Sequence, residues 1–228
     1  MKIHTPYAYK AIDAETGATQ RLYVTPSGKL PSVTTILNKT QSEDKQASLA
    51  AWRKRVGYAE AQRITTEAAR VGTHMHLILE NWAKGADAPV SPEGFEYMQA
   101  VAMAQQVKMN IERDLDEVWG TEVNLYYPKM YGGTTDLVGV YKGKPCIMDF
   151  KQTNKPKKKE WIDDYFLQGA AYAMAHNKLY GTDIKNIAIF MCSRAGEWQL
   201  FEAEGDEFNL WTRKWMEKCL NFYYKKGI

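Results

Sequence analysis

The spacing of apolar residues divides the chain into a helical part and a strand-rich part. Apolar positions recur at helical spacing from Asp44 to about Gly85. Gly57 and Gly72 are candidate positions for a break or bend, so we expect two helices there and a third over SPEGFEYMQAVAMAQQVKMNIERDLDE. From residue 118 onward the runs EVNLYY, TTDLVGVY and KPCIMDFK predict strands. A helix, two further strands (NIAIFMCS and WQLFEAE) and a last amphipathic helix are expected to complete the chain.

The first 40 residues alternate apolar and polar positions and are rich in turn residues. TPYAYKAID and QRLYVT flank an ETG turn and predict a hairpin, after which Ser32 is placed to cap a short helix, SVTTILNK. We therefore expect an α/β protein with a central mixed β-sheet flanked by α-helices and a helical N-terminal half. Residues 1–228 are expected to form one domain, with a hairpin and turn (1–40), a helical region (41–117) and an α/β core (118–228).

Composition narrows the class of protein. The 228 residues are 45% hydrophobic and 25% charged, which excludes a disordered chain, a collagen and a coiled coil. No apolar run reaches the roughly 20 residues that cross a bilayer, so we expect no membrane association. The three cysteines lack CxxC spacing, which argues against a disulfide scaffold or a zinc ribbon and excludes a four-cysteine iron–sulfur site. A net charge of +3 permits a nucleic-acid partner without requiring one.

The most informative stretch is GGTTDLVGVYKGKPCIMDFK. A turn centred between Lys142 and Gly143 places Asp136 directly opposite Asp149, about 5 Å apart between Cβ atoms. Two carboxylates so placed repel each other unless one is protonated or a cation lies between them. Alternation also puts Lys151 on that face. The pattern predicts an oxygen-bound divalent cation with an ammonium group beside its water, and the alternative is a solvated hairpin face.

Two helical pairs offer further polar groups. His76 and Glu80 are four residues apart and share a helix face, and so do Gln168 and Tyr172. An imidazole added to two carboxylates is a chemically sensible, incomplete metal site with room for water and phosphate. The alternatives are a structural histidine for the first pair and the polar rim of a small-residue packing face for the second.

Basic residues cluster in two places. Lys155 and Lys157 belong to a lysine run just after Lys151, and Trp52 precedes three consecutive cations. Lysines beside a metal site can bind phosphates, and an indole among cations suits single-stranded nucleic acid. A solvated loop and a core tryptophan are the respective alternatives.

These motifs together resemble those of the PD-(D/E)XK nucleases of the RecB/Cas4-like branch. The matching patterns are G-x-x-x-H-x-x-x-E from Gly72 to Glu80, G-x-x-D ending at Asp136, D-F-K from Asp149 to Lys151, and Q-x-x-x-Y from Gln168 to Tyr172. LPSVTTIL and YKGKPCIMDFKQTNKPK are more specifically similar to the mitochondrial genome maintenance exonuclease group and its phage and bacterial relatives. The resemblance covers residues 30 to 180.

The resemblance implies a role for each matching residue. It implies that His76, Asp136, Asp149 and the Phe150 carbonyl bind the metal, that Lys151 is catalytic and that Glu80 orders the metal shell or its water. It also implies that the helices between residues 45 and 70 form an arch over single-stranded DNA. It implies DNA contacts by Ser32, Val33 and Thr34, and by Gln168 and Tyr172, which also support the site. Trp52, Lys155 and Lys157 are the DNA contacts predicted from the basic clusters. Gln152 departs from the family, which often has Thr or Ser after the lysine.

We therefore predict a Mg²⁺- or Mn²⁺-dependent DNA exonuclease that prefers single-stranded ends, leaves 5′-phosphates and acts in DNA replication, repair or recombination. A replication or recombination protein is an expected partner. Because the first residues carry neither a secretory signal nor an organelle presequence, we expect a cytoplasmic protein of a bacterial cell or a phage-infected host. A structure-specific or restriction-like endonuclease and a non-catalytic DNA-binding module are the alternatives.

Overall fold

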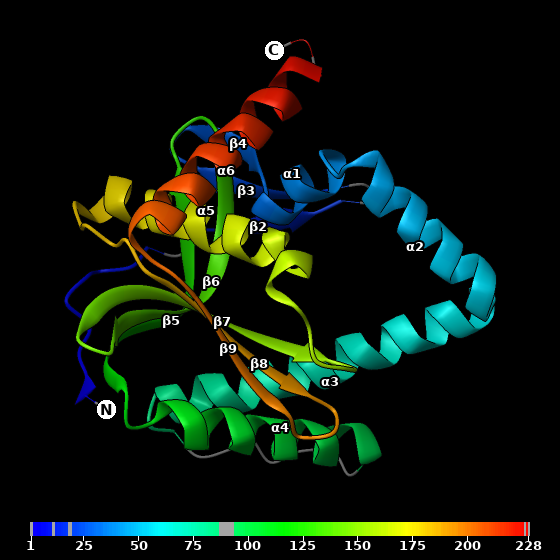
Figure 1. Ribbon diagram of the computed structural model, residues 1–228. Coiled ribbons are helices and arrows are strands. Elements are labelled where there is room, and N and C mark those ends of the chain that lie inside the picture. Colours follow the sequence, from blue (N-terminus) through cyan, green and yellow to red (C-terminus); the bar gives the residue numbers. More distant parts are fainter. Residues whose placement is uncertain (1, 11, 18–19, 87–93, 226, 228) are drawn as a thin grey trace.

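A computed structural model describes residues 2–10, 12–17, 20–86, 94–225 and 227. Its centre is a six-stranded mixed sheet in the order β1-β5-β6-β7-β8-β9, in which the pairs β1–β5 and β7–β8 are parallel and the others antiparallel (Figure 1). The strands are β1 (Lys2–Ile3), β5 (Leu115–Tyr127), β6 (Tyr131–Tyr141), β7 (Lys144–Thr153), β8 (Ile187–Ser193) and β9 (Trp198–Ala203).

Helices cover both faces of this sheet, as expected for an α/β fold with a central sheet. One face packs against α1 (Val33–Lys39), α5 (Asp163–Tyr180) and α6 (Gly205–Lys225), and the other against α3 (Tyr58–Ala83) and α4 (Phe95–Ile111). All seven residues of β8 are buried. Its apolar run from Ile187 to Cys192 is explained by their alternation between the two hydrophobic cores. No helix in the described part of the chain is long and apolar enough to cross a membrane.

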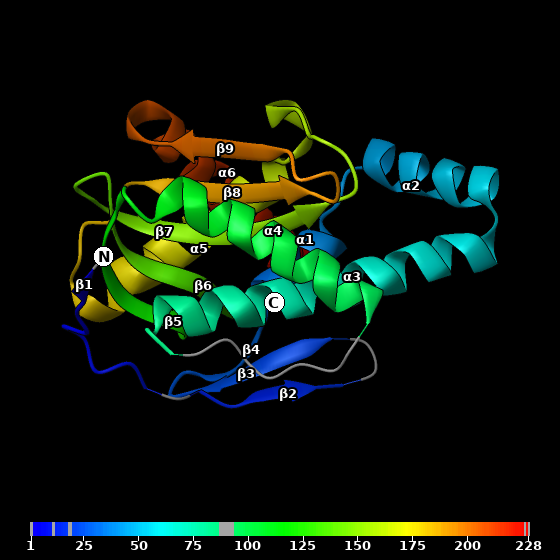
Figure 2. The same ribbon diagram turned by 90° about the horizontal axis from the view of Figure 1, so that it is seen from below.

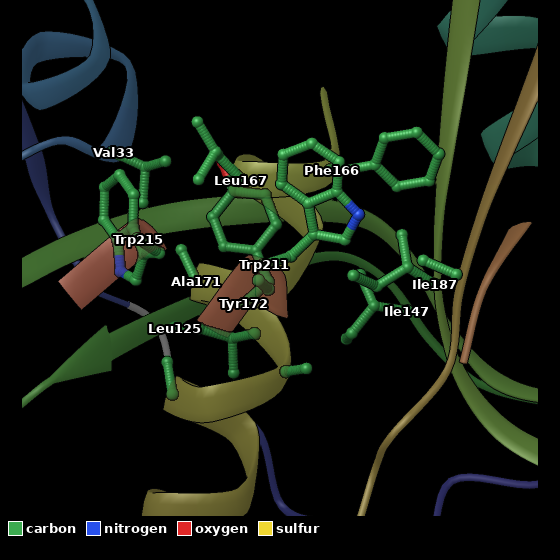
Figure 3. Close-up of a cluster of buried hydrophobic side chains, with 14 of the residues drawn as sticks. Val33, Leu125, Ile147, Phe166, Leu167, Ala171, Tyr172, Ile187, Trp211 and Trp215 are labelled. Carbon is green, nitrogen blue, oxygen red and sulfur yellow. The ribbon is translucent and has the colours of Figure 1, made fainter. Parts of the chain in front are cut away.

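Aromatic residues fill the core under α5 and α6 (Figure 3). Phe166 of α5 stacks on Trp211 of α6 with ring centroids 5.2 Å apart, and Trp215 meets the ring of Tyr131 edge-on at 5.0 Å. These large side chains bury much apolar area and fix α6 against α5 and β6. The short 3₁₀ helix η1 (Lys159–Trp161) leads from β7 into α5.

A small antiparallel sheet precedes the helices. It consists of β2 (Ala14–Thr16), β3 (Arg21–Thr25) and β4 (Gly28–Pro31), and the Tyr23 hydroxyl shares a hydrogen bond of 3.0 Å with the Thr134 hydroxyl on β6. The prediction that residues 5–13 pair with residues 20–25 is wrong, because β2 is the strand that pairs with β3. Tyr7 and Tyr9 instead pack their rings against His176 of α5, where they gain more apolar burial than an isolated hairpin would give them.

Two helices project from the body of the protein. The helices α2 (Glu43–Val56) and α3 meet at Gly57, whose φ of 88° ends α2, as the sequence predicts (Figures 1 and 2). The second candidate position, Gly72, does not break the helix: α3 continues through it, and a Cβ there would meet Gln152 of β7 at an ordinary 3.5 Å. None of the residues of α2 is buried, whereas the C-terminal half of α3 packs on the sheet.

Candidate metal centre

The β6–β7 hairpin has the predicted register. Its ladder runs from Tyr141–Lys144 to Leu137–Met148, and the turn residues Lys142 and Gly143 have the positive φ angles of a tight hairpin turn. The ladder stops one position before Asp136 and Asp149 would pair. Asp136 Oδ2 instead accepts a hydrogen bond of 2.8 Å from the backbone N–H of Phe150. Both aspartates therefore lie where the two strands separate.

His76 reaches this point from α3. Its Nδ1 lies 3.5 Å from Asp136 Oδ1, and its ring packs edge-on against Phe150 with centroids 6.1 Å apart. Burial lowers the pKa of His76, but the charge and hydrogen bonding of Asp136, together with the charge of Asp149, outweigh burial and the net shift is upward. Burial raises the pKa of Asp136, but the proximity of His76 and Lys151 outweighs burial and the net shift is downward. The two residues therefore stabilise each other's charged forms.

Glu122 completes a group that the sequence did not reveal. It lies between the paired positions Thr121–Leu137 and Val123–Thr135, opposite Asp136 on the neighbouring strand, and its φ of 48° interrupts the ladder there. One ligand atom from each of His76, Glu122 and Asp136 lies within 4.8 Å of the other two. Although Glu122 as a whole is exposed, partial enclosure of its carboxyl and the charge of Asp136 raise its pKa to about 7.

Asp149 and Lys151 form a second pair beside this group. The Lys151 ammonium makes an ion pair with Asp149 Oδ2 and lies 5.0 Å from the centre of the Tyr165 ring. Burial and the charge of Asp136 raise the pKa of Asp149 to about 6 even though Lys151 lowers it. Burial lowers the pKa of Lys151, but the two aspartates outweigh it and the net shift is upward. In the structure Asp149 pairs with Lys151 and is not a member of the His76–Glu122–Asp136 group.

The donor set suits a divalent cation. Two carboxylates and one imidazole offer the ligands that Mn²⁺ accepts and that Mg²⁺ uses in part, and three protein ligands leave positions for water and phosphate. Asp149 Oδ2 is buried, and in the described part of the chain it meets the Lys151 ammonium. Asp149 thus adds a third carboxylate at the edge of the group.

The other residues predicted to support the site are Glu80, Gln168 and Tyr172. Glu80 forms an ion pair with Lys84 one helical turn away and adds negative charge near Glu122. Gln168 Nε2 donates a hydrogen bond of 3.0 Å to the Tyr172 hydroxyl. The Tyr172 ring is buried, and a Cβ on Gly133 would overlap it, so it lies under β6 and not on a surface that DNA could contact.

The residues expected to contact DNA are not gathered in one place. Ser32 and Val33 are buried, because the Ser32 hydroxyl caps α1 and Val33 enters the core, so only Thr34 of that turn has an exposed side chain. Those two predicted contacts are therefore not available through side chains. Trp52 is partly exposed on α2. Lys155 and Lys157 are exposed, and the backbone of Lys157 is fixed by two hydrogen bonds with the Gln199 side chain.

An ion pair holds α3 against the sheet near the site. Arg194, which follows β8, donates a hydrogen bond of 2.6 Å to Glu67 of α3, and its backbone N–H bonds to the carbonyl of Thr153 at the end of β7. No sequence pattern predicts this contact, because it joins residues 127 positions apart. The pair fixes α3 and, with it, the position of His76.

Comparison with known proteins finds two similar sequences, both named mitochondrial genome maintenance exonuclease 1. The Xenopus tropicalis protein is 29% identical over 174 residues, which cover 69% of this chain and 47% of the relative. The Homo sapiens protein is 27% identical over 172 residues, which cover 68% of this chain and 47% of the relative. The chain thus spans about half the length of the curated relatives it matches.

Other comparisons add little. No protein-family model matches the chain. A crystal structure from Eubacterium rectale, named "Putative exonuclease", aligns with a TM-score of 0.48 and 12% identity over 68% of this chain and 67% of that one. The similarity that bears on function is that of the two exonuclease sequences.

Proposed function

We propose that the chain is a metal-dependent DNA exonuclease of the PD-(D/E)XK type that hydrolyses phosphodiester bonds near the ends of single-stranded DNA. The observation that carries the proposal is the group His76, Glu122 and Asp136 beside the ion pair of Asp149 with Lys151. The order and spacing of these motifs and the similarity to two exonucleases support it.

The chemistry follows from the side chains present. A Mg²⁺ or Mn²⁺ ion bound there would neutralise charge on the scissile phosphate and lower the pKa of a bound water. Asp136 and Glu122 hold their carboxylates toward one point, and His76 closes the third side. Lys151 is a cation, because the two aspartates favour its charged form, and it is placed to orient a water or a phosphate oxygen. Cleavage of the bond between phosphorus and the 3′ oxygen leaves a 5′-phosphate.

The preference for a single strand is supported by the two projecting helices. The last turn of α2 carries Arg53, Lys54 and Arg55, and within the described residues their side chains form no hydrogen bond or ion pair. Trp52 lies next to them, half-exposed. Free cations beside an exposed indole edge can bind phosphates and stack a base. We propose that this projection, formed by α2 and the N-terminal half of α3, binds the strand.

A structure-specific endonuclease is the second candidate, because the same group of residues would serve either enzyme. A non-catalytic binding module is disfavoured, since Asp136, Asp149 and Lys151 are all present. A role in DNA replication, repair or recombination is part of the proposal, and it is supported by the words "genome maintenance" in the names of the two relatives. The replication or recombination protein partner stays a prediction from the sequence.

One digestion experiment separates these candidates. Single-stranded oligonucleotides labelled at the 5′ or the 3′ end are incubated with the protein and Mn²⁺, with EDTA as a control, beside a circular single strand. Metal-dependent release of short labelled products from the linear strand alone is the expected result. Cleavage of the circle as well would replace the exonuclease with an endonuclease. Absence of cleavage with either Mg²⁺ or Mn²⁺ would refute both enzymes.

A further inference from the structure

A pocket of about 400 Å³ adjoins the metal centre on the side away from the projecting helices. It lies between the C-terminal end of α3, the strand β5 and the N-terminal segment of the chain. Glu122 belongs both to the wall of this pocket and to the metal-binding group. Its other principal wall residues are Thr5, Tyr9, Lys10, Lys84 and Trp119.

The order of features along α3 gives the pocket its position. The helix starts at the projection, passes Arg194 at Glu67 and the metal group at His76, and ends at Ala83 beside the pocket. At 1.5 Å per residue, His76 and Ala83 are roughly 10 Å apart along the helix axis. Figure 2 shows α3 running from the α2 junction to the side of the sheet where β1 and β5 lie. A strand that crosses the metal centre from the projection therefore arrives at this pocket.

The walls of the pocket offer apolar and aromatic groups for a base and a cation for a phosphate. Ile3, Ala83, Val118 and Val123 line it with apolar groups, and Tyr9 and Trp119 add aromatic rings, which suits the faces of a base. Lys10 is exposed, and its side chain has no ion-pair partner among the described residues, while Lys84 is tied to Glu80. Lys10 is thus a cation free to pair with a phosphate at the rim.

We infer that this pocket binds the terminal nucleotide of the strand being cut. This inference deepens the proposed function and rests on it. A bound end fixes the number of nucleotides between the end of the strand and the metal centre, so the pocket sets the length of the released product. It also makes a free end, and not only a single strand, the feature that the enzyme recognises.

The inference is tested first without cleavage. Binding of dinucleotides with a 5′- or a 3′-phosphate is measured by titration calorimetry in EDTA with the full chain. Lys10→Glu is expected to weaken the binding of the preferred dinucleotide about fivefold to tenfold. Thr5→Trp, which fills the pocket from an exposed position, is expected to weaken it at least as much. Lys129→Glu, the same charge change on an exposed turn between β5 and β6, is the control and should bind normally.

Product lengths provide the second measurement. With Mn²⁺, the original chain should release products of a narrow length range, and Lys10→Glu and Thr5→Trp should broaden or shift that range, whereas Lys129→Glu should not. Equal dinucleotide affinity in all four proteins, or identical product lengths, would overturn the pocket assignment while leaving the nuclease in place. Normal dinucleotide binding by a protein that cuts no DNA would instead refute the proposed function alone.

Discussion

The carboxylate of Asp136 accepts the backbone N–H of Phe150 at 2.8 Å, across the point where β6 and β7 stop pairing. A side chain thus takes a hydrogen bond that the ladder no longer supplies, and the strands can part without leaving that buried N–H unsatisfied. The separation relieves the repulsion that a direct pair of Asp136 and Asp149 would suffer. It also leaves one oxygen of each aspartate available for a cation.

Removing the ammonium group should stop the chemistry without unfolding the protein. Lys151→Ala is expected to lower the cleavage rate by about 10²–10³-fold, because a positioned charge at the reacting phosphate is lost. The affinity for a single-stranded oligonucleotide, measured in EDTA, should change little. Rates from end-labelled substrate in Mn²⁺ test this, with Lys129→Ala, at an exposed lysine outside the predicted site, as the control. A variant that retained full activity would exclude the proposed role of Lys151.

Glu122 should contribute to metal affinity although no motif contains it. Glu122→Gln keeps the shape of the side chain but removes its charge, and we expect the dissociation constant for Mn²⁺ to rise about 10- to 100-fold. Asp149→Asn should also reduce binding, since its oxygen lies at the edge of the group.

The measurement is the upward shift of the melting temperature on adding Mn²⁺, which reports binding to the folded state. Glu112→Gln, an exposed glutamate at the end of α4, is the control. An unchanged Mn²⁺ response in Glu122→Gln would remove this residue from the ligand set.

Two glycine substitutions near the site should have opposite effects on stability. A Cβ at Gly133 would overlap the buried Tyr172 ring, so Gly133→Ala should lower the free energy of unfolding by about 1–3 kcal/mol. At Gly72 a Cβ meets Gln152 at an ordinary 3.5 Å, so Gly72→Ala should stabilise α3 by about 0.5–1 kcal/mol. Urea unfolding measures both. Equal effects of the two substitutions would contradict the packing described here.

His176 should make stability depend on pH. It is fully buried, bonded to the Tyr9 hydroxyl at 3.0 Å and to the Thr182 hydroxyl at 2.8 Å, and burial lowers its pKa from 6.5 to about 4. Between pH 6.5 and pH 4 the unfolded chain binds a proton that the folded chain does not. The free energy of unfolding should therefore fall on acidification through this window, by up to about 1.4 kcal/mol per pH unit from this residue.

Urea unfolding at several pH values tests the role of His176. His176→Gln should flatten the slope of stability against pH in that window, because glutamine does not titrate there. His4→Gln, at an exposed position, should leave the slope as it is. A slope that His176→Gln left unchanged would show that other groups cause the acid sensitivity.

The sequence predicted the parts of the fold that depend on local rules. The alternation in β6 and β7 and the turn at Lys142 and Gly143 gave the register of the hairpin, and the cap at Ser32 and the break at Gly57 also follow from residue type. These features need only short-range geometry. The prediction that His76 and Asp136 share one site rests instead on the resemblance of their motifs to those of a nuclease family.

The rest depended on packing between distant segments. By its position in the strand pattern, Glu122 is indistinguishable from an ordinary solvated glutamate. The alternation of apolar and polar residues predicts neither its φ of 48° nor its approach to Asp136. Gly72 is a candidate helix break by residue type, yet α3 continues through it because the apolar residues around it pack on the sheet. The N-terminal hairpin was misplaced because two tyrosines gain more by packing on His176 than by pairing as a strand.

The absence of buried residues in α2 has a thermodynamic consequence. Its helical state rests on the Ser42 cap, on acidic residues in its first turn and basic residues in its last turn, and on an ion pair between Lys45 and Asp164, none of which involves the hydrophobic core. Such a segment opens at a small cost in free energy while the sheet stays intact. Its amide hydrogens should exchange with solvent long before those of α5, and DNA binding should slow that exchange. Part of the binding energy would then be spent on ordering the helix, so affinity should respond to helix-stabilising substitutions far from any DNA contact.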